Sequence, residues 1–185
     1  GLTVSSYWTR TNSGTNTETT SAIRRRISTT GGTRFYTTNI NLGASITAFF
    51  YVDPDTGGSS ANAEMGWQVL QSFCFTPRMR YTCRFYTRVG QMARLVDYTG
   101  AVVATLNIDP TRVQFLYVAE SSNRLEVYYR LPGAHVWTSW YQTATPAIDT
   151  SVSGVSKTEV MWGNIDSGTA ISDWRLVAVA SNDLA

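Results

Sequence analysis

Apolar and polar residues alternate with a period of two in many short stretches of this chain. The clearest stretch is 125–130, with the sequence Leu-Glu-Val-Tyr-Tyr-Arg. Successive side chains of a β-strand point to opposite faces of a sheet, so this stretch predicts a strand with one buried and one wet face. No window longer than ten residues repeats apolar residues at the helical spacing i, i+3, i+4 and i+7. The chain is therefore predicted to be all-β.

Turn residues divide the alternating stretches. Thr99-Gly100 predicts a tight hairpin between strands at 92–98 and 101–108. The other predicted strands cover 35–42, 44–52, 66–75, 80–89, 113–119, 125–130, 136–142, 157–163 and 171–180. Many short strands at regular spacing are typical of a two-sheet sandwich or a barrel.

The first 33 residues differ in composition from the rest. They are rich in Thr, Ser, Gly and Asn, and the stretch 9–20 offers little that could enter a core. We expect residues 1–33 to form an extended arm or edge strand that ends at the turn Thr30-Gly31-Gly32. Residues 34–185 are predicted to be a single β-sandwich domain, because 185 residues are too few for two domains of ordinary size.

Charge is sparse and nearly balanced. Only 15% of the residues are charged, against about 25% in an average domain, and the net charge is +2. This balance does not favour a nucleic-acid partner. No apolar run is long enough to span a membrane, and the N-terminal residues lack the pattern of a signal peptide, so neither is expected.

Two cysteines, Cys74 and Cys83, would face each other across a hairpin whose turn lay at Arg78-Met79. A disulfide would then be geometrically possible, although the absence of a signal peptide favours a reduced pair. Whether the two are bridged stays open.

Residues suited to catalysis or metal binding are few. The single histidine, His135, and two cysteines cannot form an ordinary zinc site, and we expect His135 in a surface loop. A glycosidase needs two facing carboxylates about 5 to 9 Å apart. Glu126 and Glu64 are the candidates, but Glu126 alternates outward and Glu64 lies in a polar stretch. The sequence therefore predicts no enzyme, no cofactor and no metal.

The stretch Asp53-Pro54-Asp55-Thr56-Gly57-Gly58, with Glu64 at position twelve, has some features of a calcium loop. The fifth position is Gly rather than Asp or Asn, and Pro54 disturbs the pattern. We interpret the stretch as a turn.

Aromatic side chains gather on neighbouring predicted strands. Aromatic rings stack on the apolar faces of sugars while polar neighbours bond the hydroxyls. Alternation places Trp137 and Tyr141 on one face and Trp140 on the other, so at least one face is expected in the core. The candidate ligand-binding residues are Tyr128, Trp137, Trp140 and Tyr141.

Three consecutive arginines, Arg24, Arg25 and Arg26, form the second candidate group. No nucleic-acid motif surrounds them, so an interface with another protein or a solvated loop is favoured over phosphate binding.

The order of segments after Cys83 resembles a known family. Residues 84–88, 94–97, 100–106 and 125–128 are followed by a Trp-bearing strand, by Trp162-Gly163-Asn164 and by 172–177 with Asp173. This order resembles the concanavalin A-like (laminin G-like) jelly-roll modules in structural proteins of tailed bacteriophages, especially those of actinobacterial hosts. In that family a late Gly-Asn turn precedes a terminal strand that carries an Asp. The resemblance covers about residues 80–180.

The resemblance implies a two-sheet antiparallel jelly-roll sandwich in a non-enzymatic virion structural protein. Such a protein would decorate the capsid or belong to the tail, attach to other virion proteins and be made in the host cytoplasm. A carbohydrate-binding module that recognises a host surface glycan is the alternative, and a glycoside hydrolase is a further one. A homo-oligomer such as a trimer is common among such proteins, whereas nucleic-acid and membrane partners are not expected.

Overall fold

All regular structure in the described part of the chain is β-strand. The computed structural model describes residues 7–21, 25–40, 45–55, 65–72, 78–86, 92–107, 112–120, 124–149 and 157–181. The strands are β1 (Thr9–Asn12), β2 (Thr15–Thr20), β3 (Arg25–Ile40), β4 (Ile46–Asp55), β5 (Met65–Ser72), β6 (Arg78–Tyr86), β7 (Met92–Val96), β8 (Val102–Asn107), β9 (Val113–Glu120), β10 (Arg124–Arg130), β11 (Thr138–Thr143), β12 (Ile148–Asp149) and β13 (Lys157–Ser181). Within these ranges no helix is long and apolar enough to cross a bilayer.

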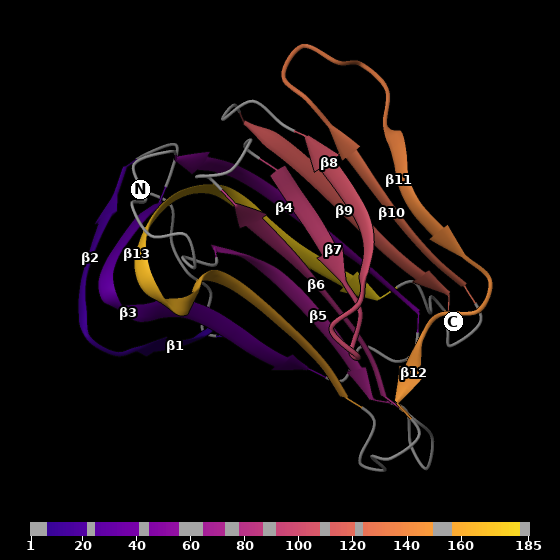
Figure 1. Cartoon of the computed structure of the whole chain (residues 1–185), viewed down its shortest axis with the longest axis horizontal. Coiled ribbons are helices and arrows are strands. Elements are labelled where there is room, and N and C mark those ends of the chain that lie inside the picture. The colour runs from indigo at the N-terminus through magenta and orange to yellow at the C-terminus, as the bar shows by residue number, and fades with distance from the viewer. Residues whose placement is uncertain are drawn as a thin grey trace.

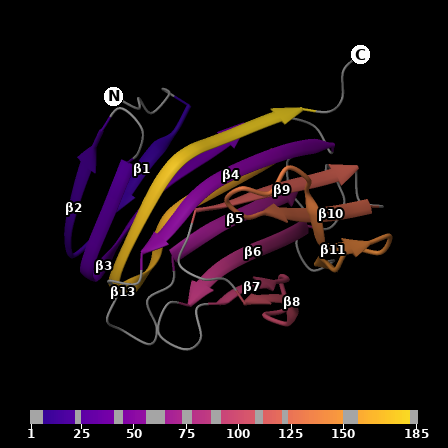
Figure 2. The ribbon, with the colours of Figure 1, turned by 90° about the horizontal axis from the view of Figure 1, so that it is seen from above.

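The strands form one antiparallel sheet that folds over on itself. Its main path runs β11-β10-β9-β4-β13-β5-β6-β7-β8. The first part of β13 pairs with β5 through residues 157–164, and its last part pairs with β4 through residues 171–181. Figures 1 and 2 show the resulting two layers, β4–β9–β10–β11 and β5–β6–β7–β8, joined on the side of β3 and β13. The predicted two-sheet antiparallel sandwich is confirmed.

The strands β3 and β13 bend at the same level, next to the connection between β1 and β2, and this bend joins the two layers. Gly32 of β3 pairs with Gly168 of β13 on one side and lies against Ser13 and Gly14 on the other. A Cβ on Gly32 would lie 2.0 Å from the Ser13 carbonyl oxygen, so the backbones approach closely only because a side chain is missing. The ribbon of β1, β2, β3 and β13 can therefore pass from one layer into the other.

Two strand boundaries predicted from the sequence differ in the structure. The predicted turn at Thr30-Gly31-Gly32 is a bend within β3, which continues from Arg25 to Ile40. The predicted strands 157–163 and 171–180 are likewise parts of the single strand β13. Residues 9–12 and 15–20 hydrogen-bond to β3 as an edge strand. The division of the chain into 1–33 and 34–185 stays a prediction.

A polar network holds the bend from inside. Asn164 donates through Nδ2 to the Ile27 carbonyl and to Thr29 Oγ1, at 3.3 and 3.2 Å. Ser172 donates its hydroxyl to Asn164 Oδ1 at 2.7 Å and accepts from Trp174 Nε1 at 2.8 Å. Each buried polar group named here has a partner, which removes the cost of desolvating it unpaired.

The core lies between the two layers and is dense in aromatic rings. Phe50 of β4 stacks on Trp67 of β5, with the ring centroids 4.6 Å apart. Phe115 and Tyr117 of β9 also pack on Trp67, and all four side chains are fully buried. Because the inner faces meet here, the outer faces of the two layers point in opposite directions and can carry separate sites.

The cysteine expectation needs correction. β5 ends at Ser72 and β6 begins at Arg78, and the register places Cys83 opposite Trp67 rather than opposite Cys74. The condition under which the two cysteines would face each other, a turn at Arg78-Met79, is not met, because both residues belong to β6. Cys74 itself lies outside the described residues. Cys83 is buried, and this burial raises the pKa of its thiol.

Candidate functional site

The outer face of β10 carries a row of polar and aromatic side chains. Arg124, Glu126, Tyr128 and Arg130 occupy its alternate positions, while the residues between them point into the sandwich. This confirms the prediction that Glu126 points outward from a half-buried strand. Six residue steps at about 3.3 Å each give the row a length of roughly 20 Å.

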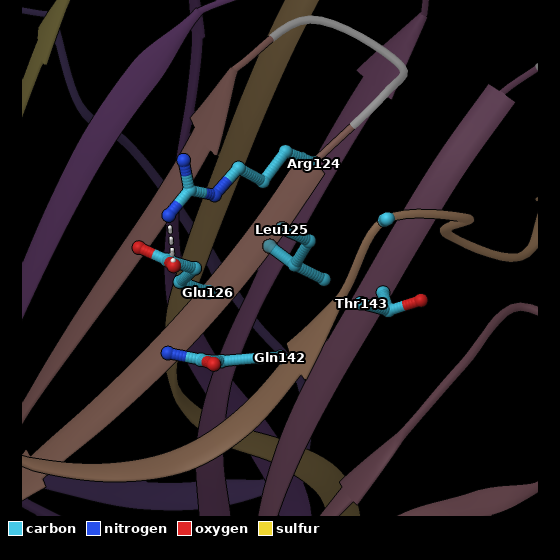
Figure 3. A pocket seen from close by; sticks show the side chains of 6 residues that line it. Arg124, Leu125, Glu126, Gln142 and Thr143 are labelled. Atoms are coloured by element: carbon cyan, nitrogen blue, oxygen red, sulfur yellow. Dashed lines mark hydrogen bonds and ion pairs between the residues drawn. The ribbon is translucent and has the colours of Figure 1, made fainter.

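A pocket of about 280 Å³ opens at one end of this row. It is lined by Arg124, Leu125 and Glu126 of β10 and by Gln142, Thr143 and Ala144 at the end of β11. Gln142 lies directly across from Glu126 in the sheet. Figure 3 shows Arg124, Glu126 and Gln142 on one side of the two strands, with Leu125 and Thr143 on the other.

Glu126 is the electrostatic centre of the pocket. Tyr128 donates its hydroxyl to Glu126 Oε2, and Arg124 donates through Nη2 to Oε1, both at 2.6 Å. These two hydrogen bonds, that from Tyr128 first, lower the pKa of Glu126. The same contact with Glu126 raises the pKa of Tyr128. Glu126 is therefore held as a carboxylate that accepts hydrogen bonds.

This shift is opposite to the one that a glycosidase acid needs. The proton donor of a glycosidase has a raised pKa, whereas that of Glu126 is lowered. Its suggested companion, Glu64, lies outside the described residues. The lowered pKa of Glu126 does not fit the role of proton donor, and the suggested pair with Glu64 stays a prediction.

Trp137 lies at the other end of the row. The guanidinium carbon of Arg130 lies 4.7 Å from the Trp137 ring centroid, and Phe49 meets the same ring edge-on at 6.2 Å. Arg130 also donates through Nε to Gln114 Oε1 at 2.9 Å. These contacts hold an aromatic ring against the outer face, before β11 begins.

The predicted aromatic group is divided by a bulge. Val127 pairs with Tyr141, but Tyr128 pairs with Ser139, so Trp140 is an extra residue in β11. Both Trp140 and Tyr141 then pack toward the core, with ring centroids 5.4 Å from Phe115 and 5.9 Å from Tyr81 respectively. Trp140 thus lies on the face opposite Trp137, as predicted, but the predicted place of Tyr141 on the face of Trp137 was wrong, because a bulge shifts the period by one residue.

Tyr128 and Trp137 thus remain on the outer face, while Trp140 and Tyr141 leave it. The sequence reasoning did not select Arg124, Arg130 or Gln142 as site residues. The period-two pattern of 125–130, continued back to 124, could have identified the two arginines, since it places both on the face of Tyr128.

Arg25 and Arg26, which lie in the described part of the chain, both pair with acidic side chains of the same chain. Arg25 pairs with Glu18 and donates to the Tyr36 hydroxyl at 3.0 Å. Arg26 donates through Nε and Nη2 to the two carboxylate oxygens of Asp173, both at 2.8 Å. Arg24 lies outside the described residues. A role of this group at an interface stays a prediction.

The remaining candidates are the residues considered for metal binding and His135. In the ranges that the structure covers, no three or more His, Cys, Asp or Glu side chains lie close enough together to hold a metal ion. Asp53 lies 3.8 Å from Arg175, and residues 56–64 of the suggested calcium loop lie outside the described residues. His135 lies in the exposed connection between β10 and β11, as expected.

No protein-family model and no curated protein sequence matches this chain. Solved structures do match it. The exoplasmic/lumenal domain of VIP36, in its Ca²⁺-bound form, has a TM-score of 0.62 at 9% identity and covers 97% of this chain and 85% of its own. The legume lectin-like domain from Entamoeba histolytica gives 0.56 at 8%, covering 93% and 89%.

A phage protein belongs to the same set of similar structures. The CBM2 module of the evolved Dit of Lactobacillus casei BL23 phage J-1 has a TM-score of 0.61 at 9% identity, covering 99% of this chain and 94% of the module. The chain has a concanavalin A-like lectin fold. Identities this low show the fold alone, so the fold that the sequence resemblance implied is confirmed, whereas the actinobacterial phage type is not supported.

Proposed function

We propose that this chain is a non-enzymatic carbohydrate-binding module of a bacteriophage virion, and that it binds a host surface glycan along the outer face of β10. The observation that carries the proposal is the array of Arg124, Glu126 and Tyr128 beside an open pocket. Attachment to other virion proteins, in the tail or as capsid decoration, is part of the same proposal.

The array fits the chemistry of a sugar. Hydroxyl groups both donate and accept, and the site offers the Glu126 carboxylate as acceptor and the Arg124 and Gln142 side chains as donors. The half-buried rings of Tyr128 and Trp137 lie on the outer face, where an aromatic ring can suit the apolar face of a pyranose. A pocket of about 280 Å³ lies near the lower end of small-molecule pockets, roughly 300–1,000 Å³, and suits one sugar residue.

The comparisons support this choice among the alternatives. The VIP36 domain has also been solved in a Ca²⁺/Man2-bound form, with a TM-score of 0.60 to this chain. The phage J-1 module supports the virion setting, because it is a carbohydrate-binding module within a Dit. The lowered pKa keeps Glu126 ionised as a hydrogen-bond acceptor, which suits the binding of a sugar hydroxyl. No cation is part of the proposal, because the described residues offer no metal-binding cluster.

A glycan array followed by NMR titration tests the binding. We expect an oligosaccharide to shift the amide signals of residues 124–130 and 137–143, and the Tyr128→Ala and Trp137→Ala variants to bind at least about tenfold more weakly. Tyr7→Ala is the matched control, because Tyr7 is 73% exposed and lies before β1. Unchanged binding in both site variants would overturn the proposed site. Polysaccharide cleavage that Glu126→Gln abolishes would overturn the non-enzymatic assignment.

Localising the chain on purified phage particles tests the virion setting. Deleting residues 1–30 is a poor test, because it removes β1, β2 and the first part of β3. In the intact chain β2 pairs with β3, and β3 pairs with β13. A particle reconstruction or antibody labelling leaves the fold intact. Absence of the chain from washed particles would contradict the virion assignment.

A further inference from the structure

A second cavity lies on the outer face of the opposite layer. It has a volume of about 320 Å³ and is lined by β5, β6, β7 and the turn that follows β7. Its floor is the cross-strand row Gln68, Thr82 and Val96. Thr82 and Val96 are only 6% and 4% exposed although they point outward, so the cavity is a recess and not a flat surface.

Two arginines stand at the ends of this recess. Arg80 and Arg84 lie two positions on either side of Thr82 and therefore share its face. Arg80 donates through Nη2 to the Tyr98 carbonyl oxygen at 3.1 Å, which fixes its head against the wall. That contact uses one of the five N–H groups of a guanidinium.

A third arginine adds to the positive charge. Arg94 lies directly opposite Arg84 on the neighbouring strand β7. Like charges directly opposite each other in a sheet are unfavourable for stability. Arg80, Arg84 and Arg94 therefore share one outer face beside the cavity, and Arg84 and Arg94 also interact with other groups of the chain.

Asp97 is the one carboxylate among the described lining residues, and it serves the adjacent turn. Asp97 Oδ1 accepts from the Thr99 amide at 2.9 Å, from the Thr99 hydroxyl at 2.6 Å and from the Ala101 amide at 3.1 Å. Because one oxygen receives these three donors, Asp97 stabilises the β7–β8 turn. On the floor, the Thr82 hydroxyl donates to Gln68 Oε1 at 3.2 Å, so the Gln68 amide nitrogen remains a donor group.

We propose that this recess binds an anionic oxygen group of an acidic glycan, either a carboxylate or a phosphate. The planar guanidinium groups of Arg80 and Arg84 match both groups in bidentate geometry, and the Gln68 amide supplies a further donor. The inference rests on the proposed function for its glycan context. It adds a second site on the face opposite the β10 row, so that one chain contacts a charged polymer with two surfaces.

Titration with small probes tests the inference. Inorganic phosphate and glucuronate represent the two anionic groups, and glucose is the neutral match for glucuronate. We expect the anions to shift the amide signals of Thr82, Val96 and Thr99 while glucose leaves them unchanged. The Arg80→Gln/Arg84→Gln double variant should bind the anions at least about tenfold more weakly. The Arg10→Gln/Arg112→Gln double variant removes the same charge at two exposed arginines outside both pockets, and it should bind the anions as the unmodified chain does.

The preferred anion identifies its source. Stronger binding of glucuronate indicates an acidic sugar, and stronger binding of phosphate indicates a phosphate-linked polymer; either supports the inference. Binding that 0.5 M salt leaves unchanged would contradict it, because charge attraction is screened over roughly 3 to 8 Å at such ionic strength. Equal affinity in the double variant, or no shift with any anion, would overturn it.

The two proposals can fail separately. A neutral oligosaccharide that binds at β10 and β11, without anion binding at Arg80 and Arg84, overturns this inference alone. Anion binding at the recess without any neutral binding supports the inference and counts against the β10 site. Unchanged thermal unfolding of the double variant shows that the loss is one of binding and not of folding.

Discussion

Trp162 and Trp174 lie on the same strand and face each other across the core. Their ring centroids are 5.2 Å apart, although the two residues are separated by twelve positions in β13. A straight strand of that length would separate them by roughly 40 Å. The contact therefore depends on the bend in β13, and the bend depends on the backbone approach at Gly32.

The first prediction concerns that bend. Gly32→Ala should lower the free energy of unfolding by about 3 kcal/mol or more, because the new Cβ would meet the Ser13 carbonyl oxygen of the neighbouring strand. Urea unfolding followed by tryptophan fluorescence measures the change. Gly133→Asn is the control, since Gly133 has a φ of 80° with open space around it, and should cost about 1 kcal/mol or less. Similar losses in the two variants would contradict this account.

The second prediction concerns the pair of Arg26 and Asp173. Asp173→Ala should lower the free energy of unfolding by about 2 kcal/mol, because two hydrogen bonds to a charged group are lost at a carboxylate whose side chain is 3% exposed. Glu120→Ala should cost less than about 1 kcal/mol, because the Glu120–Arg124 pair is more than half exposed. Chemical unfolding compares the two, and an equal cost would show that burial does not strengthen the first pair.

The third prediction concerns pH. The pKa of Glu126 is lowered in the folded chain, by Tyr128 and then by Arg124. The stabilisation is therefore fully present above the ordinary pKa of Glu and is lost as the pH falls through the lower, folded value. Carboxyl-carbon NMR should show Glu126 titrating below an ordinary Glu, with Tyr128→Phe moving its pKa upward. An unchanged pKa in that variant would mean that the hydroxyl contact is not the main cause.

The same array predicts the pH range of glycan binding. Binding at β10 should persist from neutral pH down through the ordinary pKa range of Glu, because Glu126 stays ionised there. Loss of binding at or above the ordinary Glu pKa, measured by the same titration, would show that another group controls the site.

The fourth prediction concerns Cys83. Its thiol is buried, and the burial raises its pKa, so little thiolate forms at neutral pH. A thiol-alkylating reagent should label Cys83 slowly in the native chain and rapidly in urea, as read by peptide mass spectrometry. Rapid native labelling would place Cys83 at an accessible position, contrary to its place opposite Trp67.

Local patterns predicted the strands well and their partners poorly. The Thr99-Gly100 hairpin formed as expected, with the Asp97 amide bonded to the Ala101 carbonyl at 3.0 Å, because a tight turn joins residues that are close in sequence. The outward position of Glu126 followed from the same local alternation. The cross-strand neighbour of Cys83 could not be read from the local pattern, because it depends on where the chain turns between β5 and β6.

The sequence by itself determined the all-β class, most of the strands and the outer face of β10, because alternation is a property of consecutive residues. Only the tertiary structure decided that Tyr141 turns inward after a bulge, that β3 passes through Gly31-Gly32 as one strand, and that Arg26 meets Asp173. The bulge depends on the register between β10 and β11, and the other two features depend on pairing between strands far apart in the chain. The Arg80–Arg84 recess is likewise a tertiary feature, because the row of Gln68, Thr82 and Val96 beneath it comes from three different strands.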